Sequence, residues 1–325
     1  MHEIDIRRIE NIRIGNAEDA AGATGCTVIL CENGAPCGVD IRGGGPASRE
    51  TPLLDPRAAS EGIHAVLLSG GSAFGLDAAG GVMRFLEERD IGFPVGVTKV
   101  PLVCQSSIFD LVVGSKDARP DTNMGYAACE SAWKNQFCEG NHGAGTGATV
   151  GKLFGTDTMM KSGLGAYAVE IGELKVGAVV VVNALGNVYD PEKNISVAGL
   201  LNPQKTGLLD TAQQMYHMYA DLGDVFTGNT TIGAVITNAG FDKAHMGKVA
   251  AMAHNGYVRT ILPVNTTADG DSIYALSVGN VKADINVVGT LAAHVVERAV
   301  LRAVWSAEPA YGLLCAHDLE KMNGL

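Results

Sequence analysis

Clusters of glycine limit what this chain can fold into more than any other feature of its sequence. The 325 residues include 42 glycines, about one residue in eight, against an average usage of about 7%. They show no Gly-X-Y repeat, so a collagen-like rod is excluded. They gather instead at residues 43–45, 70–71, 80–81 and 143–147. Because glycine lets the backbone turn tightly or approach a neighbour closely, these clusters predict either close packing between layers or a site built from backbone.

The composition is that of a folded, acidic protein. Hydrophobic residues make up 46% of the chain and charged residues 18%, which provides a packed core and excludes a disordered chain. A net charge of −11 and a pI of about 5.2 exclude a broad basic surface, so we expect no nucleic-acid partner. Apolar runs such as residues 176–182 are shorter than the roughly 18 residues of a membrane helix, so we expect no membrane partner.

The first residues and the cysteines point to a cytoplasmic protein. The first eight residues are charged and lack the apolar core of a secretory signal. The seven cysteines are odd in number and include no Cys-x-x-Cys pair, which excludes a fully paired disulfide scaffold. We therefore expect reduced thiols and a cytoplasmic location.

Strand-like and helix-like segments alternate along the whole chain. Apolar and β-branched runs predict strands at residues 24–30, 37–41, 64–68, 176–183, 230–237 and 272–278. Helical periodicity predicts helices at 76–88, 121–133, within 203–224, at 241–261 and at 285–305. The dipeptide Asn33-Gly34 predicts a hairpin between the first two strands. With no Pro- or Ser-rich linker and no internal repeat, this order favours one layered α/β domain over residues 1–325.

Several common catalytic motifs are incomplete. A glycine-rich run ends in Gly151-Lys152, but threonine at 146 and leucine at 153 break the phosphate-loop pattern. The eight histidines show no zinc-binding spacing, and Ser72 stands one place early for the nucleophile elbow of a serine hydrolase. We therefore expect no metal and no cofactor. Lys152 is either a solvated lysine or one that a glycine-rich turn delivers to a site.

Two polar pairs stand at the start of predicted strands. Thr230 and Thr231 follow a polar loop that ends at Asn229, and Asp269 and Asp271 lie on a turn before the strand at 272–278. Taken alone, the threonines are typical of a strand end and the aspartates of a turn. Because neighbouring residues of a strand face opposite sides, only one of the two threonines can face a site.

Several longer motifs occur in one order along most of the chain. They are Gly-Asn-Ala at 15–17, Leu-Ser-Gly-Gly-Ser-Ala-Phe-Gly-Leu at 68–76, Gly-Ala-Gly-Thr-Gly-Ala-Thr-Val-Gly-Lys at 143–152, Val-Asn-Ala-Leu-Gly at 182–186, Asn-Thr-Thr-Ile at 229–232 and Asp-Gly-Asp at 269–271. Together they resemble the DmpA-like peptidases, which comprise L-aminopeptidase/D-esterases, β-aminopeptidases and nylon-oligomer hydrolases.

The resemblance implies a layered αββα sandwich of the N-terminal-nucleophile hydrolase type, assembled as a homo-oligomer. It also implies self-cleavage between Asn229 and Thr230 into a large chain, 1–229, and a small chain, 230–325. Thr230 would then be the nucleophile at the new N-terminus.

The resemblance assigns five site residues besides the nucleophile. Lys152 and Asn183 match positions that line the site, and the amide of Asn183 suits an oxyanion hole. Asp269 and Asp271 match a pair beside the nucleophile in nylon-oligomer hydrolases. Tyr126 matches an active-site tyrosine.

These residue types agree with amide hydrolysis. A threonine hydroxyl is a weak nucleophile until a base takes its proton, and an α-amine with a pKa of about 7.7–8.0 can be that base. At Thr230 this amine exists only after cleavage. Lys152 can keep the amine neutral by charge repulsion, and Asp269 or Asp271 can orient it. The Asn183 amide can donate to the oxyanion, an effect worth roughly 3–4 kcal/mol.

The expected function is a self-processing N-terminal-threonine hydrolase of the aminopeptidase type, acting on small peptides or peptide-like amides. Two alternatives stay open: an acyltransferase similar to ornithine acetyltransferase, and an unprocessed binding protein without activity. Aminopeptidases of this kind need an acidic group near the substrate amine. Met124, two residues before Tyr126, instead places an apolar side chain in that neighbourhood. A requirement for a free amine on the substrate is therefore not part of this prediction.

Overall fold

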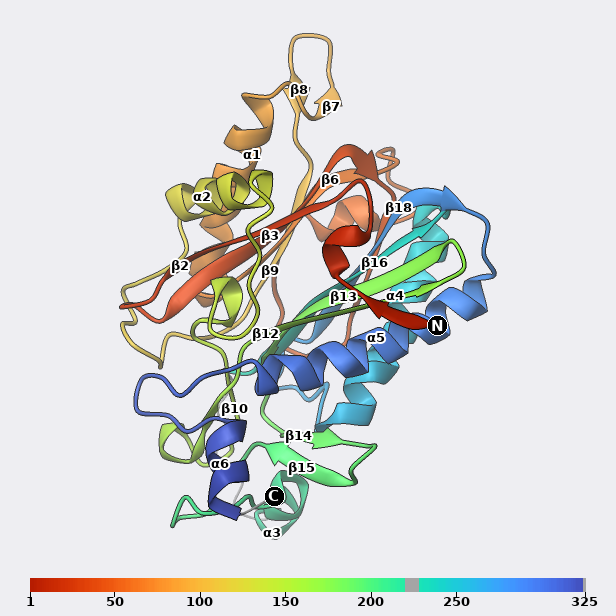
Figure 1. Cartoon of the computed structure of the whole chain (residues 1–325). Helices are drawn as coiled ribbons and strands as arrows, with labels where there is room; N and C mark the ends of the chain where they lie inside the picture. Colours follow the sequence, from red (N-terminus) through yellow and green to blue (C-terminus); the bar gives the residue numbers. More distant parts are fainter. Residues whose placement is uncertain (220–227, 324–325) are drawn as a thin grey trace.

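Two β-sheets pack face to face, and helices cover both outer faces (Figure 1). The computed structural model describes residues 1–219 and 228–323. The larger sheet contains six strands, in the spatial order β1 (His2–Ile4), β12 (Leu164–Ile171), β13 (Leu174–Asn183), β16 (Thr230–Ala239), β18 (Ser272–Val281) and β4 (Cys37–Ile41). Neighbouring strands are antiparallel except β16 and β18, which run parallel.

The smaller sheet contains five strands. Their spatial order is β2 (Arg13–Asp19), β3 (Thr24–Ala35), β6 (Ile63–Ser69), β9 (Val103–Ser107) and β5 (Ala47–Arg49). β6 and β9 run parallel, and the other pairs are antiparallel.

Four helices form the outer layers. α1 (Ala78–Glu87) and α2 (Thr122–Trp133) cover the five-stranded sheet, while α4 (Lys243–Thr260) and α5 (Ile285–Trp305) cover the six-stranded sheet. The aspartate before α2, Asp121, and the one before α4, Asp242, each accept a hydrogen bond from a backbone N–H in the first turn, which is why these helices begin there.

Shorter elements surround the sandwich. They are β7 (Phe93–Pro94), β8 (Lys99–Val100), β10 (Thr149–Val150), β11 (Met160–Lys161), β14 (Asn187–Asp190), β15 (Ile195–Ala198), α3 (Thr211–His217), β17 (Ile261–Leu262) and α6 (Ala316–Asn323). No helix within residues 1–219 and 228–323 has both the length and the apolar character needed to cross a bilayer.

Side-chain alternation along the central strands divides the core between the layers. In β13, Val179 and Val181 point toward the other sheet, whereas Val180 and Val182 pack under α4 and α5. Both sets are fully buried, so β13 is covered on both faces, as predicted for residues 176–183. The layered αββα sandwich implied by the sequence resemblance is confirmed.

Most predicted elements are present, but the predicted hairpin at Asn33-Gly34 is wrong. Both residues lie within β3, which pairs with β2 and β6, whereas β4 pairs with β18 in the other sheet. A shift in register between Leu30 and Ala35 absorbs the Asn-Gly pair, and the chain then crosses from one sheet to the other. The helix predicted within residues 203–224 is α3, and the part of that prediction beyond residue 219 lies outside the described residues.

The pair Gly80-Gly81 lies within α1, and Gly81 makes the close approach that the pair predicts. A Cβ at Gly81 would lie 1.8 Å from the carbonyl oxygen of Thr122 on α2. Reciprocally, a Cβ at Gly125 on α2 would lie 2.0 Å from the carbonyl oxygen of Ala78 on α1. The two helices therefore meet backbone to backbone, and neither glycine can be replaced without moving a helix.

This contact predicts that Gly81→Ala lowers the midpoint of thermal unfolding. The added methyl group meets backbone that cannot move alone, so the expected cost is about 1–3 kcal/mol. Gly247→Ala in α4 is the matched control, because a Cβ there meets nothing within 4 Å. The control should be as stable as the parent or more stable by up to about 1 kcal/mol. Equal midpoints for the Gly81 variant and the parent would contradict the close approach.

Candidate active site

Thr230 and Asn183 face each other at the same end of the six-stranded sheet. Thr230 is the first residue of β16 and pairs directly with Asn183, the last residue of β13. Directly opposed residues point to the same face with their Cβ atoms about 4.5–5.5 Å apart. Thr230 is in phase with Ile232, which faces the five-stranded sheet, whereas Thr231 faces the helices. Only Thr230 therefore shares a face with Asn183.

Lys152 connects the segments that meet at this end. Its Nζ donates to Oδ1 of Asn183 at 2.7 Å, to the Asn183 carbonyl at 3.1 Å and to the Gly228 carbonyl at 3.1 Å. The side chain is 1% exposed, so Lys152 is not a solvated lysine. Burial lowers its pKa to about 7, although the charges of Asp269 and Asp110 act in the opposite direction. The amine is therefore uncharged in a share of the molecules near neutral pH.

The amide of Asn183 is oriented by the groups around it. Its Oδ1 accepts from Lys152 and from the Thr149 N–H at 3.1 Å. Its Nδ2 is thereby left to donate to the Phe109 carbonyl at 3.1 Å, and it lies 3.5 Å from the Gly228 carbonyl. Gly228 is two residues before the predicted nucleophile. The donor side of the amide thus points toward the chain that leads to the predicted cleavage site.

The turn at residues 269–271 lies beside the start of β16. The Gly270 N–H donates to the Asn229 carbonyl at 3.0 Å, and Oδ1 of Asp271 accepts from the Thr231 N–H at 2.6 Å. The hydroxyl of Thr230 also donates to the Asn229 carbonyl. Two donors therefore meet on the carbonyl of the bond that the sequence predicts to be cut.

Both aspartates of this turn are buried. Oδ2 of Asp269 accepts from the Thr266 N–H at 3.0 Å and from the Thr266 hydroxyl at 2.5 Å. Burial raises the pKa of Asp269, and it raises the pKa of Asp271 to about 7, with a further contribution from the charge of Asp269. A carboxyl group with this pKa can hold or release a proton near neutral pH.

Tyr126 is placed away from these residues. It lies on α2, and its hydroxyl donates to Oε2 of Glu88 at 2.7 Å. Its ring packs edge-on against Phe85 and lies under the guanidinium of Arg84. The structure thus brings five of the six predicted site residues to one end of the six-stranded sheet and leaves Tyr126 in the outer helix layer.

One buried residue beside the site was not predicted. Asp110 is 2% exposed and accepts from the Gly71 N–H at 2.7 Å and from the Thr24 hydroxyl at 2.6 Å. Burial raises its pKa to about 6. A Cβ at Gly147 would lie 2.7 Å from the Asp110 side chain, so the glycine run packs directly on this carboxyl group. The signal in the sequence is a single carboxylate within an apolar run, Ile-Phe-Asp-Leu-Val-Val at residues 108–113.

Lys161 is a second buried lysine that the sequence did not reveal. Its Nζ donates to the carbonyls of Gly145 at 2.9 Å, Ala148 at 3.1 Å and Ser162. Burial lowers its pKa to about 7. Because two of these carbonyls belong to the segment that leads to Lys152, Lys161 holds that segment in place. No spacing or motif marks Lys161 in the sequence.

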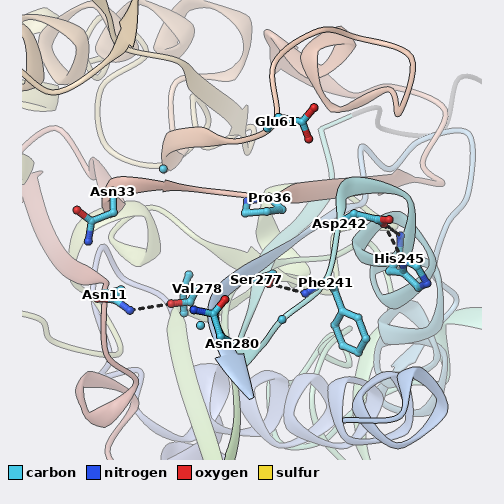
Figure 2. Close-up of a pocket in the computed structure, with 13 residues that line it drawn as sticks. Asn11, Asn33, Pro36, Glu61, Phe241, Asp242, His245, Ser277, Val278 and Asn280 are labelled. Atoms are coloured by element: carbon cyan, nitrogen blue, oxygen red, sulfur yellow. Dashed lines mark hydrogen bonds and ion pairs between the residues drawn. The ribbon is translucent and has the colours of Figure 1, made fainter. Parts of the chain in front are cut away.

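A large open hollow of about 840 Å³ lies at the opposite end of β16 (Figure 2). None of the predicted site residues lines it, and it lies about 30 Å from Thr230 along a ten-residue strand. Three of its polar side chains are already bonded: Asn11 donates to the Val278 carbonyl at 2.8 Å, and the His245 ring lies 2.6 Å from the Asp242 carboxylate. The candidate chemistry is therefore at the Thr230 end.

Known proteins resemble this chain over almost its whole length. Residues 5–315 match the sequence profile of Peptidase family S58. The chain belongs to this family. An uncharacterised aminopeptidase of Mycobacterium tuberculosis is 36% identical over 342 residues, which cover 97% of each chain. A 6-aminohexanoate-oligomer endohydrolase of a Kocuria species is 31% identical and covers 90% of this chain and 83% of its own.

A solved structure with the same fold supports the architecture. The L-aminopeptidase D-Ala-esterase/amidase of Ochrobactrum anthropi, described as a variant of the Ntn hydrolase fold, superposes with a TM-score of 0.65. The match covers 98% of this chain and 94% of that chain, at 18% identity. The resemblance to DmpA-like peptidases is confirmed, and this S58 chain is a hydrolase of the peptidase or amidase type.

The two buried lysines predict how stability depends on pH. Lys152 and Lys161 have a pKa of about 7 when folded, against a normal value of 10.5. Between these values the unfolded chain binds more protons than the folded chain, so the free energy of unfolding rises with pH above about 7. Each lysine contributes up to about 1.4 kcal/mol per pH unit.

The measurement is urea unfolding at pH 7.5 and pH 8.5 of two proteins that both carry Thr230→Ala. One of them keeps Lys161, and the other also carries Lys161→Met. The chain that keeps Lys161 should gain more stability over this interval, and only the difference between the two proteins is used. Identical pH dependence in both would contradict the lowered pKa of Lys161.

Proposed function

We propose that this S58 peptidase is a self-processing amidase whose nucleophile is Thr230. Cleavage of the bond after Asn229 would free Thr230 as a new N-terminus. The observation that carries this proposal is the meeting of the Thr230 hydroxyl and the Gly270 N–H on the carbonyl of Asn229. A hydroxyl nucleophile and an oxyanion donor already in contact with one buried peptide bond are what self-cleavage needs.

The proposed processing step is an N-to-O acyl shift followed by hydrolysis. Oγ1 of Thr230 attacks the carbonyl carbon of Asn229, an ester bond forms, and the peptide C–N bond breaks. The hydroxyl proton passes to the leaving nitrogen, which becomes the α-amine of Thr230. Water then hydrolyses the ester, leaving a carboxylate on Asn229 and restoring the hydroxyl. The Gly270 N–H stabilises the oxygen on which negative charge develops.

Lys152 is the buried amine best placed to move the proton in that step. It is held at the carbonyl of Gly228, one residue before Asn229, and its pKa of about 7 leaves part of it uncharged at neutral pH. Proton transfer is most effective when the pKa of the base lies near the working pH.

In the processed enzyme the α-amine of Thr230 would act as the general base for its own hydroxyl. Asn183 would offer Nδ2 to the oxyanion of the substrate, since its Oδ1 is already occupied by Lys152 and Thr149. Asp271 would hold the shortened strand end through the Thr231 N–H, with Asp269 beside it. Tyr126 has no part in this proposal.

Amide bonds of small peptides or peptide-like compounds are the proposed substrates. The names of the two relatives, an aminopeptidase and a 6-aminohexanoate-oligomer endohydrolase, have hydrolysis of an amide bond in common. The proposed steps need only a hydroxyl, amines, carboxyl groups and amide donors, so this scheme requires no cofactor.

The proposed processed enzyme remains one αββα domain over residues 1–325. β16 begins the small chain and lies between β13 of the large chain and β18 of the small chain, with ladder hydrogen bonds to both. The two chains therefore share one sheet after cleavage. Assembly as a homo-oligomer and a cytoplasmic location stay predictions from the sequence.

The direct test is the intact mass of the purified protein. Cleavage before Thr230 divides 325 residues into chains of 229 and 96, with masses of about 24 and about 10 kDa out of 33.7 kDa. N-terminal sequencing of the small chain should begin Thr-Thr-Ile-Gly. Thr230→Ala should stay a single chain without amidase activity, and Thr230→Ser should keep some cleavage because it keeps a hydroxyl.

Thr231→Ala is the control for this test. Its hydroxyl faces the helices, so this variant should still be cut between residues 229 and 230. Cleavage and activity of Thr230→Ala at the level of the parent, or a small chain with another first residue, would refute the assignment of the nucleophile.

A second test concerns the acid pair. Asp271→Asn and Asp269→Asn keep the size of the side chain but remove the charge, so we expect kcat to fall by at least about tenfold, more than the loss of folding stability accounts for. Asp157→Asn, at an exposed position, is the matched control and should leave kcat unchanged. If the pair served only as a turn, the variants would instead lose thermal stability and keep their activity per folded molecule.

A further inference from the structure

Two buried hydroxyl groups on the helix-facing side of β16 lack a hydrogen-bond partner among the described residues. They are Oγ1 of Thr231 and the hydroxyl of Tyr257, which lies on α4. Both side chains are fully buried. Buried hydroxyl groups in native proteins are nearly always bonded to protein or to ordered water, so two neighbouring exceptions call for an explanation.

The two hydroxyls lie on the same face of β16. A Cβ added at Gly233 would lie 2.7 Å from the Tyr257 hydroxyl, so the tyrosine ends directly above this glycine. Thr231 is two residues before Gly233 and therefore points to the same side, about 7 Å away along the strand. This distance separates backbone positions, and one water with hydrogen bonds on both sides bridges hydroxyl oxygens up to about 5.6 Å apart.

Asp271 lies at the same place. It is in phase with Ile273, which packs under the helices, so its carboxyl group is on the same side of the sheet as Thr231. Its two oxygens accept from the backbone N–H groups of Thr231 at 2.6 Å and of Asn265 at 2.9 Å, which leaves lone pairs on both. Burial raises the pKa of the Tyr257 hydroxyl, and the nearby charge of Asp271 adds to the shift.

A third polar atom without a partner among the described residues completes the cluster. Oδ1 of Asn265 is buried and unpaired, and its own backbone N–H bonds to Asp271. Two unpaired hydroxyls and one unpaired acceptor thus belong to residues that bond to the Asp271 carboxyl group or lie on its side of the sheet. A water molecule has two donors and two acceptors, which is the set that these groups need.

We propose that an ordered internal water lies between Thr231, Tyr257 and Asp271, and that Thr231 and Tyr257 are positioning residues for the Asp271 carboxyl group. The inference rests on the proposed function, because Asp271 acts there by holding the strand end that carries the nucleophile. The water fixes the carboxyl group from the helix side while the Thr231 N–H fixes it from the strand. Loss of the water removes one of the hydrogen bonds that hold the carboxyl group in place beside the new N-terminus.

The first test is a crystal structure at a resolution that shows ordered water, for the parent and for Tyr257→Phe. The parent should show a water within hydrogen-bond distance of Tyr257, Thr231 and Asp271, and the variant should lose it. A dry site in the parent would overturn the proposal. The water is a feature of the fold, so this result is obtained whether or not the chain cuts itself, and a failure of processing would count against the proposed function alone.

The second test is kinetic and uses an aminoacyl p-nitroanilide as the substrate. Tyr257→Phe should lower kcat by about tenfold with little change in KM, because the Asp271 carboxyl group loses one of the bonds that position it. Thr231→Val, which removes the other hydroxyl at constant volume, should have the same effect and serves if the tyrosine variant does not fold. Unchanged kcat in both variants would overturn the positioning role.

Tyr274→Phe is the matched control. Tyr274 is as deeply buried as Tyr257, but it faces the other sheet, and its hydroxyl is bonded to the Ser106 hydroxyl at 2.9 Å. Removing that hydroxyl should lower the midpoint of thermal unfolding and leave kcat unchanged. A lower kcat in Tyr257→Phe together with an unchanged kcat in Tyr274→Phe would show that the Tyr257 hydroxyl acts by positioning Asp271 and not by stabilising the fold in general.

Discussion

The buried amine of Lys152 is the interaction on which the candidate site depends. An ammonium group is costly to bury unless oxygens surround it, and here the side-chain and main-chain oxygens of Asn183 and the carbonyl of Gly228 provide that shell. These acceptors belong to the end of β13 and to the segment before β16. The need to pair one nitrogen therefore fixes the spacing between the strand end that carries Asn183 and the strand start that carries Thr230.

The glycine clusters make this arrangement sterically possible. A Cβ at Gly151 would lie 2.1 Å from the backbone of Gly199, and one at Gly43 would lie 2.3 Å from the backbone nitrogen of Asp271. Side chains at these positions would push the lysine segment and the Asp-Gly-Asp turn away from the strand ends. The glycine clusters therefore serve both purposes that the sequence suggests. They allow close packing and they build the site, because the site consists of loops packed backbone to backbone.

Local patterns predicted the helices that cover the two sheets and six of the eleven sheet strands, and they failed where the fold depends on distant contacts. Val-rich β13 and the periodic α5 follow from their own residues. The pair Asn33-Gly34 has the residues of a hairpin turn, but pairing of β4 with β18 overrides that preference. Lys161 and Asp110 are set by carbonyls and glycines far away in the sequence, which leave no local signal. The expectation for Tyr126 rests on the family resemblance alone, and α2 carries this residue in the outer helix layer.

The position of Thr230 within the sheet also determines how the proposed amine would titrate. Burial lowers the pKa of an amine from about 7.7–8.0, and the charge of Lys152 lowers it further, whereas the charges of Asp269 and Asp271 raise it. Lys152 and Asp271 have pKa values of about 7, and the charge of Asp269 acts on both groups. Groups that are coupled through a shared neighbour in this way titrate together. The pH dependence of turnover would then reflect all of these groups together. A substitution of Lys152 or Asp271 would shift the whole pH profile.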